Sequence, residues 1–122
     1  MILVDTSVWV EHLRSGSAVL STALEEGQVL THSMIRGELA LGTIAPRHAL
    51  LASLAALPHA ARATDEEVLV LINGMELHGR GLGLVDAHLL AACMLTPGIR
   101  VWTTDQRLHA AAAEFGVVWD AA

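Results

Sequence analysis

The chain has 122 residues, which is enough for one compact domain, residues 1–122, and too few for two. It carries 13 acidic residues against seven arginines and no lysine, so its formal net charge is −6, which disfavours the basic surface typical of nucleic-acid binders.

The mean hydropathy of +0.51 is high. However, a membrane-spanning helix needs about 20 apolar residues. The longest run without a charged residue, His48–Ala61, is interrupted by Pro58. We therefore expect no membrane segment.

The first residues show no sign of a signal peptide, because no basic residue precedes Asp5 and no long apolar run follows it. Cys93 is the single cysteine and lies in an apolar helical segment, where it is expected to act as a small core residue. Both features predict a cytoplasmic protein that keeps its thiol reduced.

Apolar runs alternate with segments of helical periodicity, which predicts an α/β fold with a parallel sheet. Strands are predicted at Ile2–Val4, Val29–Thr31, Arg100–Thr103 and, as an edge strand, Val117–Trp119. Helices are predicted from Asp5 to about Arg14, with Val8, Trp9 and Leu13 facing inward, and at Ser17–Glu26, Ser33–Gly42, 47–57, from Thr64 to about Met75, Leu84–Thr96 and Asp105–Phe115.

Two of these helices carry distinctive local signals. Thr64 and Glu67 have the spacing of a capping box, in which each side chain accepts a backbone hydrogen bond from the other residue. The segment Ala49–Leu57 is polar only at Ser53, and a helix that is apolar all round is either enclosed in the core or packed against a partner. Both interpretations of this segment stay open.

Four acidic residues stand where an acid is locally out of place: Asp5, Glu38, Asp86 and Asp105. Asp5 and Asp105 each follow a predicted strand, and ligands of open parallel sheets bind beyond the carboxyl ends of strands. Glu38 and Asp86 lie at helical spacing from apolar neighbours, so both are predicted on buried stripes. Four convergent carboxylates would repel one another unless a cation neutralised them. Their hard oxygen atoms suit Mg²⁺ or Mn²⁺.

Each acid also has an ordinary structural interpretation. Asp5 and Asp105 are well placed to be helix N-caps, and Asp86 to be a first-turn acid that interacts with the helix dipole. Glu38 has Arg36 nearby in sequence as a possible ion-pair partner. The conjunction of all four acids favours the metal site.

The motifs around these acids are similar to those of PIN domains, and more narrowly to VapC-type toxins of toxin–antitoxin pairs. They are Met1-Ile-Leu-Val-Asp5-Thr-Ser-Val-Trp9, Gly37-Glu38-Leu39, Asp86-Ala-His-Leu-Leu-Ala-Ala92 and Thr103-Thr104-Asp105. They occur in the order known for that family, and the resemblance extends over nearly the whole chain. It implies a three-layer α/β/α domain with a short central parallel sheet.

The resemblance also implies a Mg²⁺-dependent endoribonuclease that inhibits translation when it is free of its antitoxin, with Mn²⁺ as a possible substitute. Asp5 and Asp86 would be the principal metal ligands, and Glu38 and Asp105 would complete the acidic pocket. Hydroxyl groups of three residues would orient a water molecule or the scissile phosphate: Ser7, Thr103 and Thr104.

Further predictions concern the surface residues and the partners of the chain. Three arginines are candidate phosphate contacts, and the alternative for each is an ordinary solvated side chain: Arg80, Arg100 and Arg107. His88, two residues after Asp86, should lie on another helix face. The resemblance implies a homodimer bound by an antitoxin, for which Ala49–Leu57 is the candidate contact surface. The alternative function is a PIN-like module that binds antitoxin or RNA without cleaving it.

Overall fold

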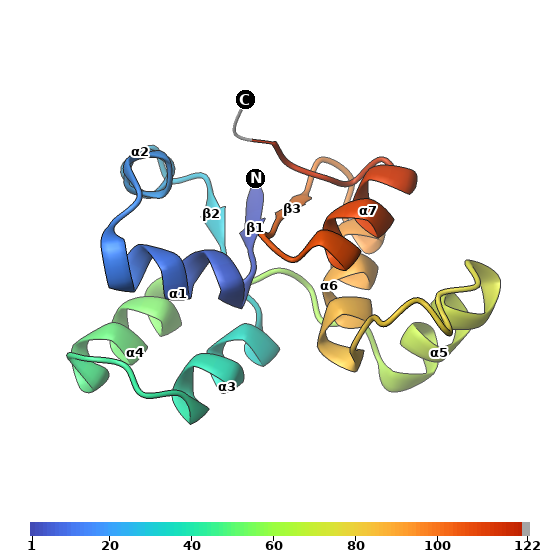
Figure 1. Cartoon of the computed structure of the whole chain (residues 1–122), viewed down its shortest axis with the longest axis horizontal. Coiled ribbons are helices and arrows are strands. Elements are labelled where there is room, and N and C mark those ends of the chain that lie inside the picture. Colours follow the sequence, from blue (N-terminus) through green and yellow to red (C-terminus); the bar gives the residue numbers. More distant parts are fainter. Residues whose placement is uncertain (121–122) are drawn as a thin grey trace.

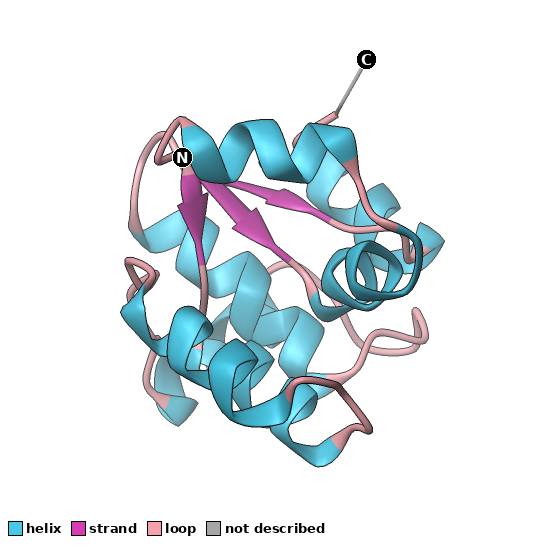
Figure 2. Ribbon diagram, turned by 90° about the vertical axis from the view of Figure 1, so that its left-hand side faces the viewer, coloured by secondary structure: helices cyan, strands magenta, loops and turns pink. Residues whose placement is uncertain are grey.

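The computed structural model describes residues 1–120, which form a three-stranded parallel sheet with helices on both faces (Figure 2). The strands are β1 (Ile2–Val4), β2 (Val29–Leu30) and β3 (Arg100–Trp102), in the order β2-β1-β3. The helices are α1 (Thr6–Ser15), α2 (Ala18–Glu25), α3 (Ser33–Leu41), α4 (Arg47–Ala56), α5 (Asp65–Gly74), α6 (Leu84–Leu95) and α7 (Gln106–Glu114). The predicted three-layer α/β/α architecture is confirmed.

The register of the sheet brings the ends of its strands to one edge. Leu3 of β1 is level with Leu30 of β2 and with Val101 of β3. Because all three strands are parallel, the residues that follow them emerge at the same carboxyl edge, and α1 leaves β1 at the end opposite the N-terminus (Figure 1). Asp5 and Thr103 therefore become neighbours although they are far apart in sequence.

The predicted edge strand at Val117–Trp119 is reduced to a single bridge between Val101 and Val118. The Val101 N–H donates to the Val117 carbonyl at 2.8 Å, and the Trp119 N–H donates to the Val101 carbonyl at 2.9 Å. The segment therefore lies beside β3 without continuing as a regular strand.

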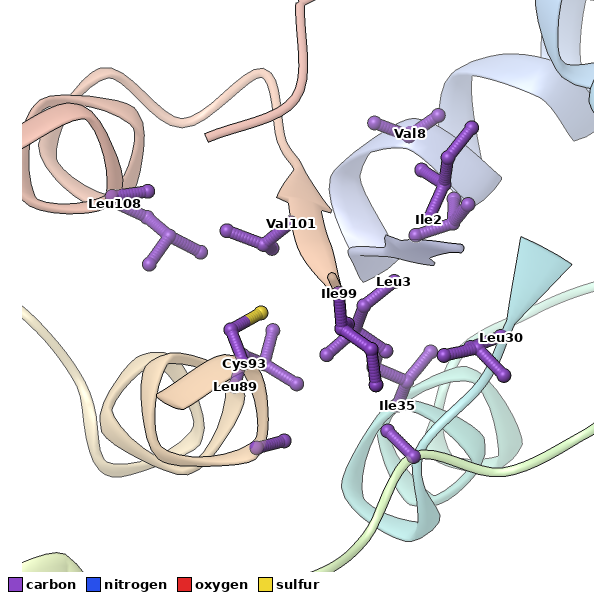
Figure 3. Packing of buried hydrophobic residues seen from close by; sticks show 14 of the residues in the cluster. Ile2, Leu3, Val8, Leu30, Ile35, Leu89, Cys93, Ile99, Val101 and Leu108 are labelled. Carbon is purple, nitrogen blue, oxygen red and sulfur yellow. The ribbon is translucent and has the colours of Figure 1, made fainter. Parts of the chain in front are cut away.

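The core is aliphatic and lies on both faces of the sheet. Figure 3 shows Val8 of α1 and Leu108 of α7 on one side of the strands, with Ile35 of α3 and Leu89 of α6 on the other. Cys93 also faces this core, and burial raises the pKa of its thiol to about 12. The interpretation of Cys93 as a small core residue is confirmed.

Local capping signals set several helix boundaries. The Ser17 side chain accepts the Leu20 N–H at the start of α2. At the start of α5, Thr64 and Glu67 form the predicted capping box, with hydrogen bonds of 3.1 and 2.9 Å. These boundaries could be predicted because a cap depends only on residues that are near one another in sequence.

Of the two interpretations left open for Ala49–Leu57, the helix α4 does not match the one enclosed in the core. Leu54 is its one buried residue, Leu50 and Leu51 are half-buried, and Ala52 and Ala55 are exposed. The helix therefore covers the core with one stripe and presents small apolar side chains outward. Periodicity could not show this, because a helix that is apolar on every side gives no indication of which side packs.

The prediction that Leu13 of α1 faces inward is also wrong, since its side chain is 38% exposed. With Val10 on the same helix, it lines a groove of about 510 Å³ that Leu39 and Ile44 border from the other side. None of the helices described for residues 1–120 combines the length and the apolar character that crossing a bilayer requires.

Candidate metal centre

Asp5 is the most buried acid of the site, with 6% of its surface exposed. Its Oδ1 atom accepts the Thr6 N–H at 2.8 Å, which makes it the N-cap of α1. Its Oδ2 atom accepts hydroxyl hydrogen bonds from Ser7 at 3.0 Å and from Thr103 at 2.7 Å. Three donors thus compensate for the removal of this carboxylate from water.

The same two hydroxyl groups connect β1 to the turn after β3. The Ser7 hydroxyl accepts the Thr104 N–H at 3.1 Å, and the Thr103 hydroxyl accepts the Asp105 N–H at 3.0 Å. Each hydroxyl has a single proton, and both protons are directed to Asp5. Ser7 and Thr103 therefore lie against Asp5, whereas Thr104 contributes its backbone and has an exposed side chain.

Asp105 and Asp86 both stand at helix starts. The Asp105 Oδ1 atom accepts the N–H groups of Arg107 at 2.9 Å and Leu108 at 3.2 Å, so Asp105 is the N-cap of α7. The Asp86 Oδ2 atom accepts the Gly83 N–H at 2.9 Å in the first turn of α6. Their ordinary structural interpretations are therefore confirmed, and each carboxylate keeps a second oxygen atom.

The prediction that Glu38 lies on a buried stripe is wrong. Glu38 is exposed, and its apolar neighbour Leu41, at helical spacing from it, is 91% exposed. The proposed ion pair with Arg36 is also wrong, because the Arg36 Nη1 atom lies 3.1 Å from the His59 Nε2 atom. Instead, the Glu38 Oε1 atom accepts a hydrogen bond of 2.7 Å from the Thr6 hydroxyl. Glu38 thus reaches the sheet edge from the surface of α3.

The pKa of Asp86 depends on its burial and on the charges of the other three acids. Burial raises the pKa of the half-buried Asp86 carboxyl, the Gly83 N–H opposes that shift, and the negative charges of Asp5, Asp105 and Glu38 raise the pKa further. Charges act in this way only over short distances. The three other acids are therefore near enough for their charges to act on the Asp86 carboxyl.

The donor set fits a hydrated hard cation. Within the described residues 1–120, no three or more His, Cys, Asp and Glu side chains are grouped closely enough to hold an ion among themselves. Mg²⁺ does not require such a cage, since it usually keeps several waters and binds one or two carboxylates together with substrate phosphate. Carboxylate oxygens at the edge of a sheet, with unneutralised charge around Asp86, match that preference.

Comparison with known proteins agrees with this geometry. The family profile of the PIN domain matches residues 2–114 of the chain. The chain belongs to the PIN domain family. It is also 50% identical over 117 residues to Ribonuclease VapC32 of Mycobacterium tuberculosis, in both strain CDC 1551 / Oshkosh and strain ATCC 25618 / H37Rv. The alignment covers 96% of this chain and 94% of that relative, which confirms the VapC-type resemblance.

The three arginines proposed as phosphate contacts occupy different places in this PIN domain. Arg80 is engaged elsewhere, because its guanidinium donates to the Glu114 carboxylate at 2.6 Å and to the Met75 carbonyl at 3.3 Å. Arg100 begins β3 at the amino edge of the sheet, about 10 Å along the strand from Thr103. Of the three, only Arg107 stands at the carboxyl edge, in the first turn of α7.

The Arg107 side chain packs against the loop that leads into α6. A Cβ atom built on Gly81 would lie 2.7 Å from the Arg107 Nη1 atom and 2.9 Å from its Cζ atom. Gly81 has a φ of +78°, so both its backbone conformation and its missing side chain permit this approach. The loop therefore holds an exposed guanidinium beside the start of the helix that carries Asp86.

Two buried histidines lie apart from the acids. The rings of His32 and His88 have centroids 6.2 Å apart, and both side chains are at most 1% exposed. Burial lowers the pKa of both, that of His32 to about 4, so both are neutral near pH 7. The His32 Nδ1 atom caps α3 by accepting the Met34 N–H at 3.0 Å. Sequence reasoning missed this cap, because His is an uncommon N-cap residue.

Proposed function

We propose that this PIN domain is a Mg²⁺-dependent endoribonuclease, the toxin of a toxin–antitoxin pair, which inhibits translation by cleaving RNA phosphodiester bonds. The observation that carries the proposal is the placement of the acids of the family motifs: Asp5 and Asp105 cap the helices that follow β1 and β3, and the Thr6 hydroxyl joins Glu38 to the same edge of the sheet. The name of the relative, Ribonuclease VapC32, supports RNA as the substrate.

Each acid is proposed to act at one metal centre. Asp5 and Asp86 hold the cation, with Mn²⁺ as a possible substitute for Mg²⁺, and Glu38 and Asp105 complete its surroundings directly or through waters. Bound Mg²⁺ supplies Lewis acidity, which makes water a better nucleophile and stabilises negative charge on the phosphoryl oxygens.

The remaining roles belong to groups that surround these acids. Ser7 and Thr103 fix the Asp5 carboxylate through the hydrogen bonds to its Oδ2 atom. Thr104, whose N–H group meets the Ser7 hydroxyl, has an exposed side chain that can orient a water molecule or the scissile phosphate. Arg107 is proposed to contact a neighbouring RNA phosphate, since its guanidinium lies beside the start of α6.

The proposed partners follow from the VapC-type likeness. We propose a cytoplasmic homodimer bound by an antitoxin. The exposed small side chains of α4, within Ala49–Leu57, are the proposed antitoxin contact. A basic antitoxin residue would neutralise the acidic centre in place of the cation, so added Mg²⁺ should weaken the complex. An affinity that does not change with Mg²⁺ would contradict this mode of inhibition.

The test is cleavage of total cellular RNA by the purified, antitoxin-free chain, with Mg²⁺, with Mn²⁺ and with chelator. Asp5→Asn removes a proposed ligand, and Asp65→Asn is the matched control, because Asp65 is an exposed first-turn acid of another helix. We expect discrete fragments that require both metal and Asp5. Absence of cleavage by a folded chain that binds Mn²⁺ would instead favour a non-catalytic module that binds antitoxin or RNA.

A further inference from the structure

Thr6 contacts two of the four acids at once. Its backbone N–H donates to the Asp5 Oδ1 atom at 2.8 Å, and its hydroxyl donates to the Glu38 Oε1 atom at 2.7 Å. Thr6 is the first residue of α1, whereas Glu38 lies in the middle of α3, 32 residues further along the chain. We propose that Thr6 is a positioning residue that holds the Glu38 carboxylate at the metal centre, an inference that rests on the proposed function.

Glu38 needs such a contact because nothing else in the described residues fixes its carboxylate. It is exposed, and the ion pairs formed within residues 1–120 involve other acids: Glu11, Glu114 and Asp120. A free glutamate side chain retains rotamer entropy, part of which is lost when a cation binds the carboxylate. A hydrogen bond formed in advance reduces that loss.

The hydrogen bond from Thr6 occupies only one oxygen atom of the Glu38 carboxylate. A threonine hydroxyl has one proton, and here it is directed to the Glu38 oxygen, which acts as the acceptor. A carboxylate that accepts on one oxygen can still offer the other to a cation or to its waters. The Oε2 atom of Glu38 is left for that purpose.

The hydroxyl groups of Thr6 and Ser7 donate hydrogen bonds to different acids. The Ser7 hydroxyl donates to the Asp5 Oδ2 atom and belongs to the network with Thr103. The Thr6 hydroxyl is turned toward α3 and serves Glu38 alone. The adjacent hydroxyls of the Asp5-Thr6-Ser7 motif therefore fix two acids that come from separate parts of the chain.

The experiment compares Thr6→Val, which keeps the shape of the side chain and removes its hydroxyl, with Thr6→Ser, which keeps the hydroxyl. Thr6→Ala is a second variant without the hydroxyl, and it favours helix formation. Thr22→Val is the matched control, because Thr22 is an exposed threonine in α2. Mn²⁺ affinity is measured by electron paramagnetic resonance on the antitoxin-free chain, and kcat and KM are measured for RNA cleavage.

We expect Thr6→Val and Thr6→Ala to weaken Mn²⁺ binding about tenfold and to lower kcat more than they raise KM. Thr6→Ser and Thr22→Val should remain close to wild type. In a Glu38→Gln background, Thr6→Val should have no further effect on Mn²⁺ affinity, because Thr6 acts through Glu38. Wild-type affinity and kcat in Thr6→Val, losses in Thr6→Ser as large as those in Thr6→Val, or an undiminished effect in the Glu38→Gln background would each overturn the inference.

Failure of this inference is distinguishable from failure of the proposed function. If wild type neither binds Mn²⁺ nor cleaves RNA, the proposed function is wrong, and the assignment of Thr6 falls with it. If wild type does both and the loss of the Thr6 hydroxyl changes neither, only the positioning role is wrong.

Discussion

The contact between Gly81 and Arg107 allows a direct test of the role of Arg107. Gly81→Ala would place a methyl group 2.7 Å from the Arg107 Nη1 atom and 3.0 Å from its Cδ atom. Since the obstructed atoms belong to a flexible, exposed side chain, the guanidinium should move away while the fold is kept. Gly79→Ala is the matched control, because Gly79 also has a positive φ, +73°, and a Cβ atom there would meet nothing within 4 Å.

The two substitutions should cost similar stability for the same reason. An alanine in a left-handed conformation costs roughly 1–2 kcal/mol relative to glycine. For a chain of 122 residues, an unfolding entropy of about 2.1 cal/mol/K per residue converts this cost into a fall in Tm of roughly 4–8 °C. Differential scanning calorimetry of both variants checks this value and shows whether each variant is folded.

RNA binding should separate the two variants. Binding of a labelled single-stranded RNA is measured by fluorescence anisotropy in chelator over a series of salt concentrations. Each phosphate contact contributes about −0.7 to the slope of log K against log salt for a single strand. We expect Gly81→Ala to bind more weakly and to lose about 0.7 from that slope, as Arg107→Gln should, while Gly79→Ala keeps the wild-type slope. Equal slopes for Gly81→Ala and Gly79→Ala would refute the phosphate contact.

Three further predictions concern stability. The pKa of Asp86 is raised in the fold, so the folded state binds a proton there more readily than the unfolded state, and stability should fall as pH rises from about 4 to neutral. Asp86→Asn should therefore raise the Tm of the metal-free chain at pH 7, and this gain should disappear near pH 3.5. The variant should also lose stabilisation by Mg²⁺. The control Asp65→Asn should show none of these changes. An equal Mg²⁺-dependent rise in Tm for Asp86→Asn and wild type would contradict its assignment as a ligand. Thr64→Ala should cost about 0.5–2 kcal/mol in chemical denaturation, because it removes the cap of α5, with RNA cleavage unchanged. Leu54→Ala should cost about 2–5 kcal/mol in the same measurement, whereas the exposed Ser53→Ala should be nearly neutral; equal costs would show that α4 is not held through Leu54.

Sequence reasoning predicted the elements whose signals are local. The starts of α2 and α5 follow from Ser17 and Thr64, each a few residues from the N–H group that it caps. The strands β1 and β3 are short, mainly apolar runs, and each is followed directly by a polar residue, Asp5 after β1 and Thr103 after β3. Asp5 and Asp105 could be placed at one edge, because parallel strands bring their carboxyl ends together.

The errors concern contacts between residues that are distant in sequence. Glu38 was assigned to a buried stripe, but α3 buries Ile35 and Leu39, and that choice depends on how the helix packs on the sheet. The pairing of Arg80 with Glu114, 34 residues away, was likewise not predicted from the sequence. The hydrogen bond from Thr6 to Glu38 spans 32 residues and has no local signature.

The helix-cap interpretation of the acids and the proposed metal site do not exclude each other, because one carboxylate could serve both. A carboxylate has two oxygen atoms and about four acceptor positions. The Asp105 Oδ1 atom accepts both cap hydrogen bonds of α7, and the Asp86 Oδ2 atom accepts the Gly83 N–H, so Oδ2 of Asp105 and Oδ1 of Asp86 stay available to a cation.

The caps also reduce the cost of assembling four negative charges before any cation binds. Asp5 and Asp105 stand at the N-termini of α1 and α7, and Asp86 lies in the first turn of α6. Each helix N-terminus carries about half a positive charge, and an acid there gains roughly 0.3–1 kcal/mol. Glu38 lies in the middle of α3 and lacks such a partner. It is accordingly the acid that depends on a side-chain donor from another helix, the hydroxyl of Thr6.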